Sequence, residues 1–150
     1  MERNKYEICI PMIFLDTSSA IEILNGNIKF AEVLTTFKKE PFAITSPSVF
    51  ELYHGIYKLT FLKQKISKKE YTKLKTDLKD FISQLRVFSL DKKAANYAAK
   101  LHMQLKGKGH EIEVFDCLIA SIILTNNFKK LLTENRKHFT HFIDLEIHSF

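Results

Sequence analysis

The sequence predicts an α/β fold with a mostly parallel central sheet of four or five strands flanked by helices. Short apolar segments alternate with longer helical segments, as expected when each strand is followed by a crossover helix. An apolar strand-like run ends abruptly at Asp16, and a helix start follows at once. With only four glycines and three prolines, the chain of 150 residues is expected to form one helix-rich domain over residues 1–150.

The expected elements follow from apolar runs and helical periodicity. The strands are expected at residues 12–15, 42–45, 86–88 and 130–133, with a fifth over 142–147. The helices are expected at residues 17–24, 28–39, 46–59, 67–85 and 92–106, with a further helix around Asp116.

Local signals set the boundaries of these helices. Asn25-Gly26-Asn27 ends the first helix, and Ser46-Pro47 supplies an N-cap followed by proline at the first helical position. Ser67-Lys68-Lys69-Glu70 is a capping box that opens a lysine-rich amphipathic helix. Asp91 is expected to cap the next helix, which several alanines support.

Three carboxylates interrupt sequence that otherwise forms core. Asp16 ends the first strand, Glu51 lies in Val-Phe-Glu-Leu-Tyr, and Asp116 lies in Val-Phe-Asp-Cys-Leu-Ile-Ala. Asp16 also fits a simple helix N-cap, and Glu51 fits an exposed position of an amphipathic helix. Asp116 is the least ordinary, because helical spacing places it on an apolar stripe with no Arg or Lys within one turn. An unpaired buried charge is costly, so a nearby cation is expected.

A shared divalent metal ion would explain all three carboxylates together. Clustered carboxylates repel, and one would take up a proton at neutral pH unless a cation joined them. Hard oxygen ligands suit Mg²⁺ or Mn²⁺. Such an ion can activate a water and offset charge developing at a phosphorus, so hydrolysis of a phosphodiester is the expected reaction.

The charge of the chain favours a polyanionic partner. The net charge is +6 and the isoelectric point about 9.2. Eight lysines lie between Lys58 and Lys79, against only Glu70 and Asp77. This segment fits a solvated helix face as well as a face that contacts phosphates. No apolar run is long enough for a membrane span and the start lacks a signal peptide, which predicts a cytoplasmic protein without membrane contact.

Four segments in order resemble the motifs of the PIN-domain nucleases, most closely the VapC-type toxins of toxin–antitoxin pairs. The resemblance covers about residues 12–147. Its segments are Phe14-Leu15-Asp16-Thr17-Ser18, Ser46-Pro47-Ser48-Val49-Phe50-Glu51-Leu52, Gly109 to Ala120 around Asp116, and Leu132-Thr133-Glu134-Asn135 up to Phe139. Each motif alone is short, but the four occur in the family's order and on the expected elements.

The resemblance implies a PIN-like three-layer sandwich, with residues 1–11 as an N-terminal extension, and a metal-dependent endoribonuclease. It implies that Asp16, Glu51 and Asp116 bind Mg²⁺ or Mn²⁺. Thr133 and Asn135 would complete the catalytic site, with Asn135 where the family also uses aspartate. Other implied features are support from Ser18 in the first loop, an RNA substrate, a homodimer and a cognate antitoxin. The residues themselves add Glu113, one turn before Asp116, as either a member of the carboxylate cluster or a residue at its rim.

Three other functions fit parts of the sequence. A di-iron protein is suggested by the Glu-x-x-His spacing of Glu51 and His54, but such a site needs two of these motifs and further glutamates. A PIN-fold nuclease for RNA processing and a basic nucleic-acid-binding module without catalysis are the alternatives that remain. His138, His141 and His148 are expected at the surface, and Cys117 as a buried thiol.

Overall fold

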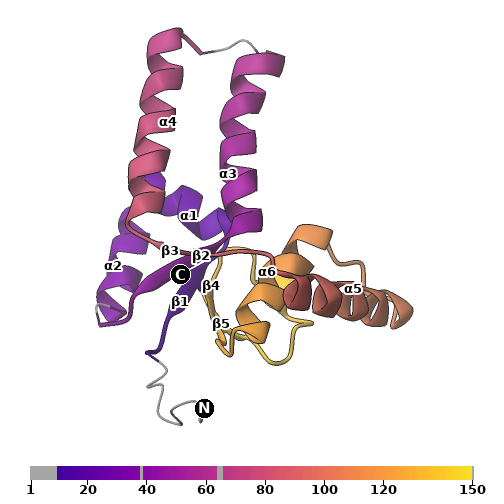
Figure 1. Ribbon diagram of the computed structural model, residues 1–150. Helices are drawn as coiled ribbons and strands as arrows, with labels where there is room; N and C mark the ends of the chain where they lie inside the picture. Colours follow the sequence, from indigo (N-terminus) through magenta and orange to yellow (C-terminus); the bar gives the residue numbers. More distant parts are fainter. Residues whose placement is uncertain (1–9, 38, 64–65, 150) are drawn as a thin grey trace, which may run out of the picture.

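The computed structural model describes residues 10–37, 39–63 and 66–149 and contains a five-stranded sheet. The strand order is β3-β2-β1-β4-β5, and every neighbouring pair is parallel. The expected α/β fold is therefore confirmed, with all strands parallel and helices on both faces (Figure 1). No helix of the described ranges combines the length and apolar character needed to cross a membrane.

The elements follow the alternation that the sequence predicts. The strands are β1 (Ile13–Leu15), β2 (Phe42–Thr45), β3 (Arg86–Phe88), β4 (Lys130–Leu132) and β5 (Glu146–His148). The helices are α1 (Thr17–Leu24), α2 (Ile28–Thr36), α3 (Ser46–Lys58), α4 (Lys68–Ser83), α5 (Lys92–Gly107), α6 (Val114–Thr125) and α7 (Arg136–Phe139), and a short π-helical turn at Leu59–Lys63 extends α3.

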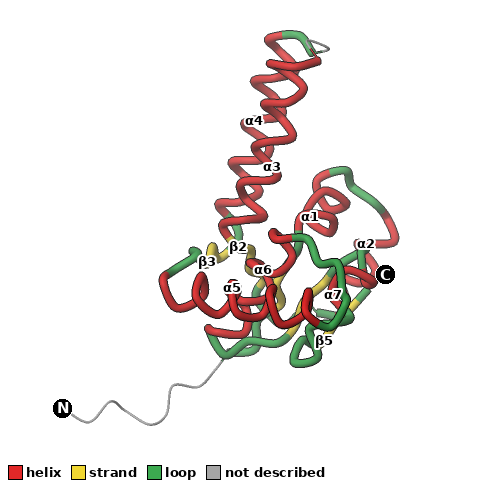
Figure 2. The backbone as a smooth tube through the Cα atoms, turned by 90° about the vertical axis from the view of Figure 1, so that its right-hand side faces the viewer, coloured by secondary structure: helices red, strands yellow, loops and turns green. Residues whose placement is uncertain are grey.

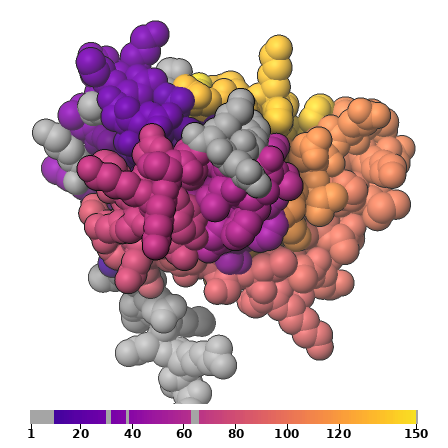
Figure 3. Space-filling model, turned by 90° about the horizontal axis from the view of Figure 1, so that it is seen from above, coloured from indigo at the N-terminus to yellow at the C-terminus, as the bar shows by residue number. Residues whose placement is uncertain are grey.

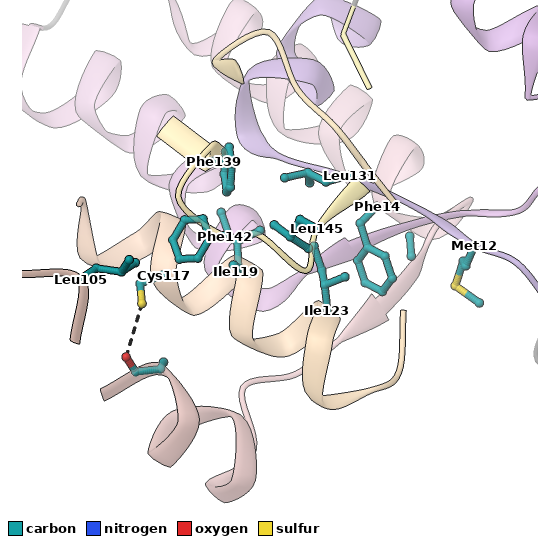
Figure 4. Close-up of a cluster of buried hydrophobic side chains, with 13 residues drawn as sticks. Met12, Phe14, Leu105, Cys117, Ile119, Ile123, Leu131, Phe139, Phe142 and Leu145 are labelled. Carbon is teal, nitrogen blue, oxygen red and sulfur yellow. Dashed lines mark hydrogen bonds between the residues drawn. The ribbon is translucent and has the colours of Figure 1, made fainter. Parts of the chain in front are cut away.

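The pleat of the sheet divides the core into two sides. Successive side chains of a strand point to opposite faces, and the buried strand residues follow this rule. On one face, Phe14 and Leu131 pack among α5, α6 and α7, as Figure 4 shows for Ile119 and Phe142. On the opposite face, strand residues such as Leu15 pack with α1, α2, α3 and α4. The result is a three-layer sandwich, and Figure 2 views it with α5, α6 and α7 toward the reader.

The order of the strands places a crevice at the edge where β1 and β4 end. The chain adds β2 and β3 on one side of β1 and then crosses to add β4 and β5 on the other side. In open parallel sheets, ligands bind outside the carboxyl ends of the strands at such a switch point. Asp16 directly follows β1 and Thr133 directly follows β4, so both residues lie at this point.

Helices α3 and α4 form a hairpin that stands out from the sheet (Figure 1). Seen from above in Figure 3, α1 and α2 lie on one side of the hairpin, and α5 and α6 on the other. The capping box at Ser67 and Glu70 is formed as predicted. Most lysines of α4 are exposed, and Lys73 forms an ion pair with Asp77 one turn later at 2.6 Å.

Four local expectations differ from the structure. Ser46 is the first residue of α3 instead of its cap, because its hydroxyl accepts a hydrogen bond from the Leu90 backbone N–H at 3.0 Å. The π-helical turn after α3 was not expected.

The fifth strand lies at Glu146–His148, because Phe142 and Leu145 turn into the core before it begins. The helix expected at 28–39 ends at Thr36, and residue 38 lies outside the described residues. Residues 1–9 of the expected N-terminal extension also lie outside them.

Candidate active site

Asp16 is held rigidly at the end of β1. It is the N-cap of α1, and its Oδ1 accepts a hydrogen bond from the Ser19 backbone N–H at 2.8 Å. The Ser18 hydroxyl lies 2.8 and 2.9 Å from the two carboxylate oxygens. The Thr133 hydroxyl donates to Oδ2 at 2.5 Å. Asp16 is only 4% exposed, so these donors stabilise a carboxylate that has lost most of its contact with water.

The segment after β4 completes the support of Asp16. Thr133 is fully buried, and its hydroxyl accepts a hydrogen bond from the Asn135 backbone N–H at 2.9 Å. The Glu134 backbone N–H donates to the Ser18 hydroxyl at 3.1 Å. Ser18 and Thr133, to which the family resemblance gave roles at the site, therefore join the ends of β1 and β4 through Asp16.

Glu51 enters from the adjacent helix α3. This helix begins directly after β2, with Pro47 in its first turn, and buries Leu52 and Ile56 against the sheet. Glu51 lies beside this apolar stripe and is half-buried. The Thr17 hydroxyl at the start of α1 donates a hydrogen bond to Glu51 Oε2, which directs the carboxylate toward the end of β1.

Asp116 occupies the first turn of α6, where the amino end of the helix favours negative charge. Its Oδ2 lies 3.0 Å from Nδ1 of His138, a residue of α7. Burial is the main cause that raises the pKa of Asp116 from 3.8 to about 6, His138 opposes this, and the charges of Glu51 and Asp16 add to the increase. The expected apolar stripe is present, because Ile119 and Ile123 are buried in the core behind Asp116.

One cavity of about 330 Å³ collects these side chains at the switch point. We call it the acidic cavity, and its lining residues are Asp16, Thr17, Ser18, Glu51, Glu113, Phe115, Asp116, Ile119, Asn135 and His138. The three predicted carboxylates thus come from the start of α1, from α3 and from α6 to a single space. Glu113 and Asn135 are exposed and lie at its rim.

The donor set of the acidic cavity suits a hard divalent cation, since all its carboxylates and the Asn135 amide offer oxygen. The charges of Asp16 and Glu51 already raise the pKa of Asp116, so a cation placed among them would relieve repulsion. In the described chain, however, no three His, Cys, Asp or Glu side chains are grouped closely enough as they stand to hold an ion. The three predicted carboxylates of Asp16, Glu51 and Asp116 are hydrogen-bonded instead, to Thr133, Thr17 and His138 respectively.

A sequence comparison identifies the family. A family model for the PIN domain matches residues 13–143. The chain belongs to the PIN domain family. PIN domains are a nuclease family, which agrees with a site built from carboxylates. A comparison with curated protein sequences gives no match.

Solved structures similar to this PIN domain include VapBC complexes. VapBC2 from Rickettsia felis, bound to a DNA fragment from their promoter, is 27% identical in sequence and has a TM-score of 0.77. The matched region covers 93% of this chain and 98% of that chain. DNA-bound VapBC from Salmonella typhimurium is 22% identical with a TM-score of 0.75 and the same coverage. VapBC-1 from nontypeable Haemophilus influenzae is 21% identical in sequence and has a TM-score of 0.74, and the matched region covers 92% of this chain and 97% of that chain. The last two likenesses support the fold.

Two polar contacts of this PIN domain were missed by sequence reasoning. His138 was expected merely at the surface, and its side chain is 51% exposed, yet its ring is hydrogen-bonded to Asp116. Thr17 was read only as a helix start, but its hydroxyl binds Glu51. The acid–imidazole contact joins positions 22 residues apart, and no periodicity in the sequence marks it.

The di-iron interpretation finds no support around Glu51. His54 is exposed and does not line the acidic cavity, and its ring stacks on Phe50 at a centroid distance of 5.5 Å. Cys117 is buried as expected, and its thiol donates to the Ala98 carbonyl oxygen (Figure 4).

Replacing Thr133 by valine should weaken both the fold and the site. Valine keeps the shape but removes the hydroxyl that donates to Asp16 and accepts from the Asn135 N–H. Loss of a buried hydrogen bond to a charged group predicts a fall of about 1–3 kcal/mol in the free energy of unfolding. Urea denaturation of Thr133→Val would measure this, with Thr72→Val on the exposed face of α4 as the control. Equal stability of wild type and Thr133→Val would contradict the assigned contacts.

Proposed function

We propose that this PIN domain is a Mg²⁺- or Mn²⁺-dependent endoribonuclease of the VapC type. The observation that carries the proposal is the convergence of Asp16, Glu51 and Asp116 on one cavity at the switch point of the sheet. Burial of Asp116, together with the charges of Glu51 and Asp16 beside it, raises the free energy of the metal-free fold, as the raised pKa of Asp116 indicates. The chain belongs to a nuclease family, and a carboxylate site that binds a divalent ion is suited to hydrolysis of a phosphodiester.

The residues of the acidic cavity have different roles in this proposal. Asp16 is the pre-oriented ligand, because hydroxyl and N–H donors hold its carboxylate in one orientation. Glu51 and Asp116 would exchange their present bonds to Thr17 and His138 for the ion. The bound ion would supply the positive charge that activates water and offsets charge developing on the phosphodiester.

The remaining cavity residues position and screen the reacting groups. Asn135, at the rim, offers a neutral amide that can orient water or the phosphodiester without adding repulsion. Phe115 and Ile119 line the apolar side and limit the access of bulk water. His138 holds Asp116 by a hydrogen bond, which would be exchanged for a bond to the ion.

RNA is the proposed substrate and an antitoxin is the proposed partner. The net charge of +6 favours a polyanion. The similar structures are VapBC complexes, and one of them is described as a member of the VapBC family of toxin–antitoxin systems, from Mycobacterium tuberculosis. A homodimer and a cytoplasmic location complete the proposal.

Cleavage of a mixed pool of tRNA and structured RNA tests the proposed activity. Wild type, Glu51→Gln and the exposed control Glu32→Gln would each be incubated with Mn²⁺, Mg²⁺ or EDTA. We expect metal-dependent cutting by wild type and the control, and a rate reduced by roughly a hundredfold or more in Glu51→Gln, because one ligand of the ion is neutralised. Cutting that continues in EDTA, or equally in Glu51→Gln, would contradict the proposal.

The same experiment separates the two remaining functions. A non-catalytic basic module would bind RNA in EDTA with undiminished affinity and would cut nothing with either metal. A PIN nuclease for RNA processing would cut, but without an antitoxin that inhibits it. A small open reading frame directly upstream, whose product suppresses cleavage when added, would support the toxin–antitoxin assignment.

A further inference from the structure

A second polar cavity of about 490 Å³ adjoins the acidic cavity. Glu113, Asp116 and His138 line both cavities and form a shared wall. The second cavity gathers four of the six histidines of the chain, together with two lysines. These residues are His102, Lys106, His110, Lys137, His138 and His141, and we call this space the histidine cavity.

The histidine cavity is built by segments distant in sequence. His102 and Lys106 come from α5, one turn apart, while Lys137 and His138 come from α7. His110, in the loop between α5 and α6, stacks on His141 with a centroid distance of 3.8 Å and an interplanar angle of 27°. This stack joins the α5–α6 loop to the segment after α7.

Several hydrogen-bond donors around this cavity lack partners. Lys106 and Lys137 are exposed, and neither has an acidic partner within ion-pair distance among the described residues. The ring nitrogens of His110 and His141 make no hydrogen bond to any other described group, whereas His102 Nε2 is occupied by the Ile112 carbonyl oxygen at 3.1 Å. Two of the acids that line the histidine cavity, Glu113 and Asp116, also line the acidic cavity and so belong to the shared wall.

We propose that the histidine cavity binds a backbone phosphate of the RNA substrate, next to the phosphodiester that is cut in the acidic cavity. Lys106 and Lys137 supply charge, and the rings of His110 and His141 supply N–H donors to its oxygens. An RNA strand that places one phosphate beside Asp116 in the acidic cavity can place a neighbouring phosphate in the histidine cavity, on the other side of the shared wall. The inference rests on the proposed function and makes these four side chains positioning residues.

The chemistry favours a phosphate over other ligands. Lysine ammonium groups are positively charged donors without acceptor capacity, so an acceptor-rich anion suits them better than a cation or a neutral donor. A metal ion is not favoured, since the ammonium groups of Lys106 and Lys137 would repel a second cation in this cavity. Glu111 is the one acid of the cavity outside the shared wall, so cationic and donor groups outnumber acids there.

Binding is tested without cleavage by titrating the wild type with inorganic phosphate in EDTA, followed by NMR of the histidine ring protons. We expect saturable shifts of the His110 and His141 signals, retained in the control Lys108→Ala, which lies outside the cavity, and lost in Lys106→Ala/Lys137→Ala. Absence of shifts at these rings, or unchanged shifts in the double variant, would overturn the proposal. Because this readout needs neither metal nor RNA cutting, its result stands even if the proposed nuclease activity fails.

Kinetics on an oligoribonucleotide test the positioning role. The double variant should raise KM about tenfold and leave kcat unchanged, and the slope of log KM against log salt should fall by about one, because the neutralisation of one backbone phosphate is lost. Lys108→Ala should behave as wild type, and all three proteins should share one melting temperature. A loss confined to kcat, or a KM unchanged at low salt, would overturn the assigned role.

Discussion

Asp16→Asn should abolish RNA cleavage while leaving the protein folded. Asparagine is as good an N-cap as aspartate, so α1 should keep its first hydrogen bond. The substitution removes one negative charge and one ligand oxygen from the best-ordered ligand in the acidic cavity. Since a divalent cation provides several kcal/mol of transition-state stabilisation, we expect the cleavage rate to fall by about three orders of magnitude.

The matched control for this prediction is Asp91→Asn. Asp91 is also an N-cap aspartate, and its Oδ1 accepts from the Ala94 backbone N–H at 2.7 Å, but it caps α5 and lies outside the acidic cavity. Its variant should cut RNA at the wild-type rate. If Asp16→Asn retained substantial activity with an unchanged melting temperature, Asp16 would be a helix cap and nothing more.

Asp116→Asn should stabilise the metal-free protein at neutral and alkaline pH. The folded-state pKa of Asp116 is about 6, above its ordinary value of 3.8, so folding costs free energy whenever the carboxylate is charged. Between these two values the folded state binds a proton that the unfolded state releases, and stability falls as pH rises. Above pH 6 the full cost is present, and asparagine removes it while its side-chain oxygen can still bond to His138.

We expect a gain of about 1–2 kcal/mol at pH 8, after allowing for solvent at the open side of the cavity, and a Tm higher by roughly 3–6 °C. The difference should vanish below about pH 3, under both pKa values, where the acid is protonated in both states. Thermal unfolding in EDTA across this range measures it, with the exposed Asp80→Asn as control. A Tm of Asp116→Asn at or below that of wild type at pH 8 would show that the acids do not strain the fold.

Much of the fold was predictable because its signals are local. The helix at Thr17–Leu24 has the predicted bounds, the capping box opens α4, and Asp91 caps α5. The position of Asp16 at the edge of the sheet could be predicted from the sequence, because the apolar run of the first strand ends directly before it. The gathering of Glu51 and Asp116 beside it was inferred from the cost of three acids in apolar sequence and from the family resemblance, since periodicity assigns a residue to a helix face but not to a neighbouring helix.

The remaining features depend on contacts between segments distant in sequence. His138 lies on a four-residue helix of mostly exposed residues, so nothing in its neighbourhood predicts a bond to Asp116. Ser46 resembles an N-cap, but a backbone group 44 residues away occupies its hydroxyl. The fifth strand begins late because Phe142 and Leu145 are core residues of a turn, which their apolar character alone does not distinguish from a strand.

The proposed nuclease requires that Asp16, Glu51 and Asp116 form one binding site for a divalent ion. Titration of Mn²⁺ into the protein, followed by EPR of the free ion, tests it most directly. We expect at least one saturable Mn²⁺ site per chain in wild type and Asp91→Asn, with affinity reduced by tenfold or more in each of Asp16→Asn, Glu51→Gln and Asp116→Asn. Absence of Mn²⁺ binding, or equal affinity in the three variants, would contradict it.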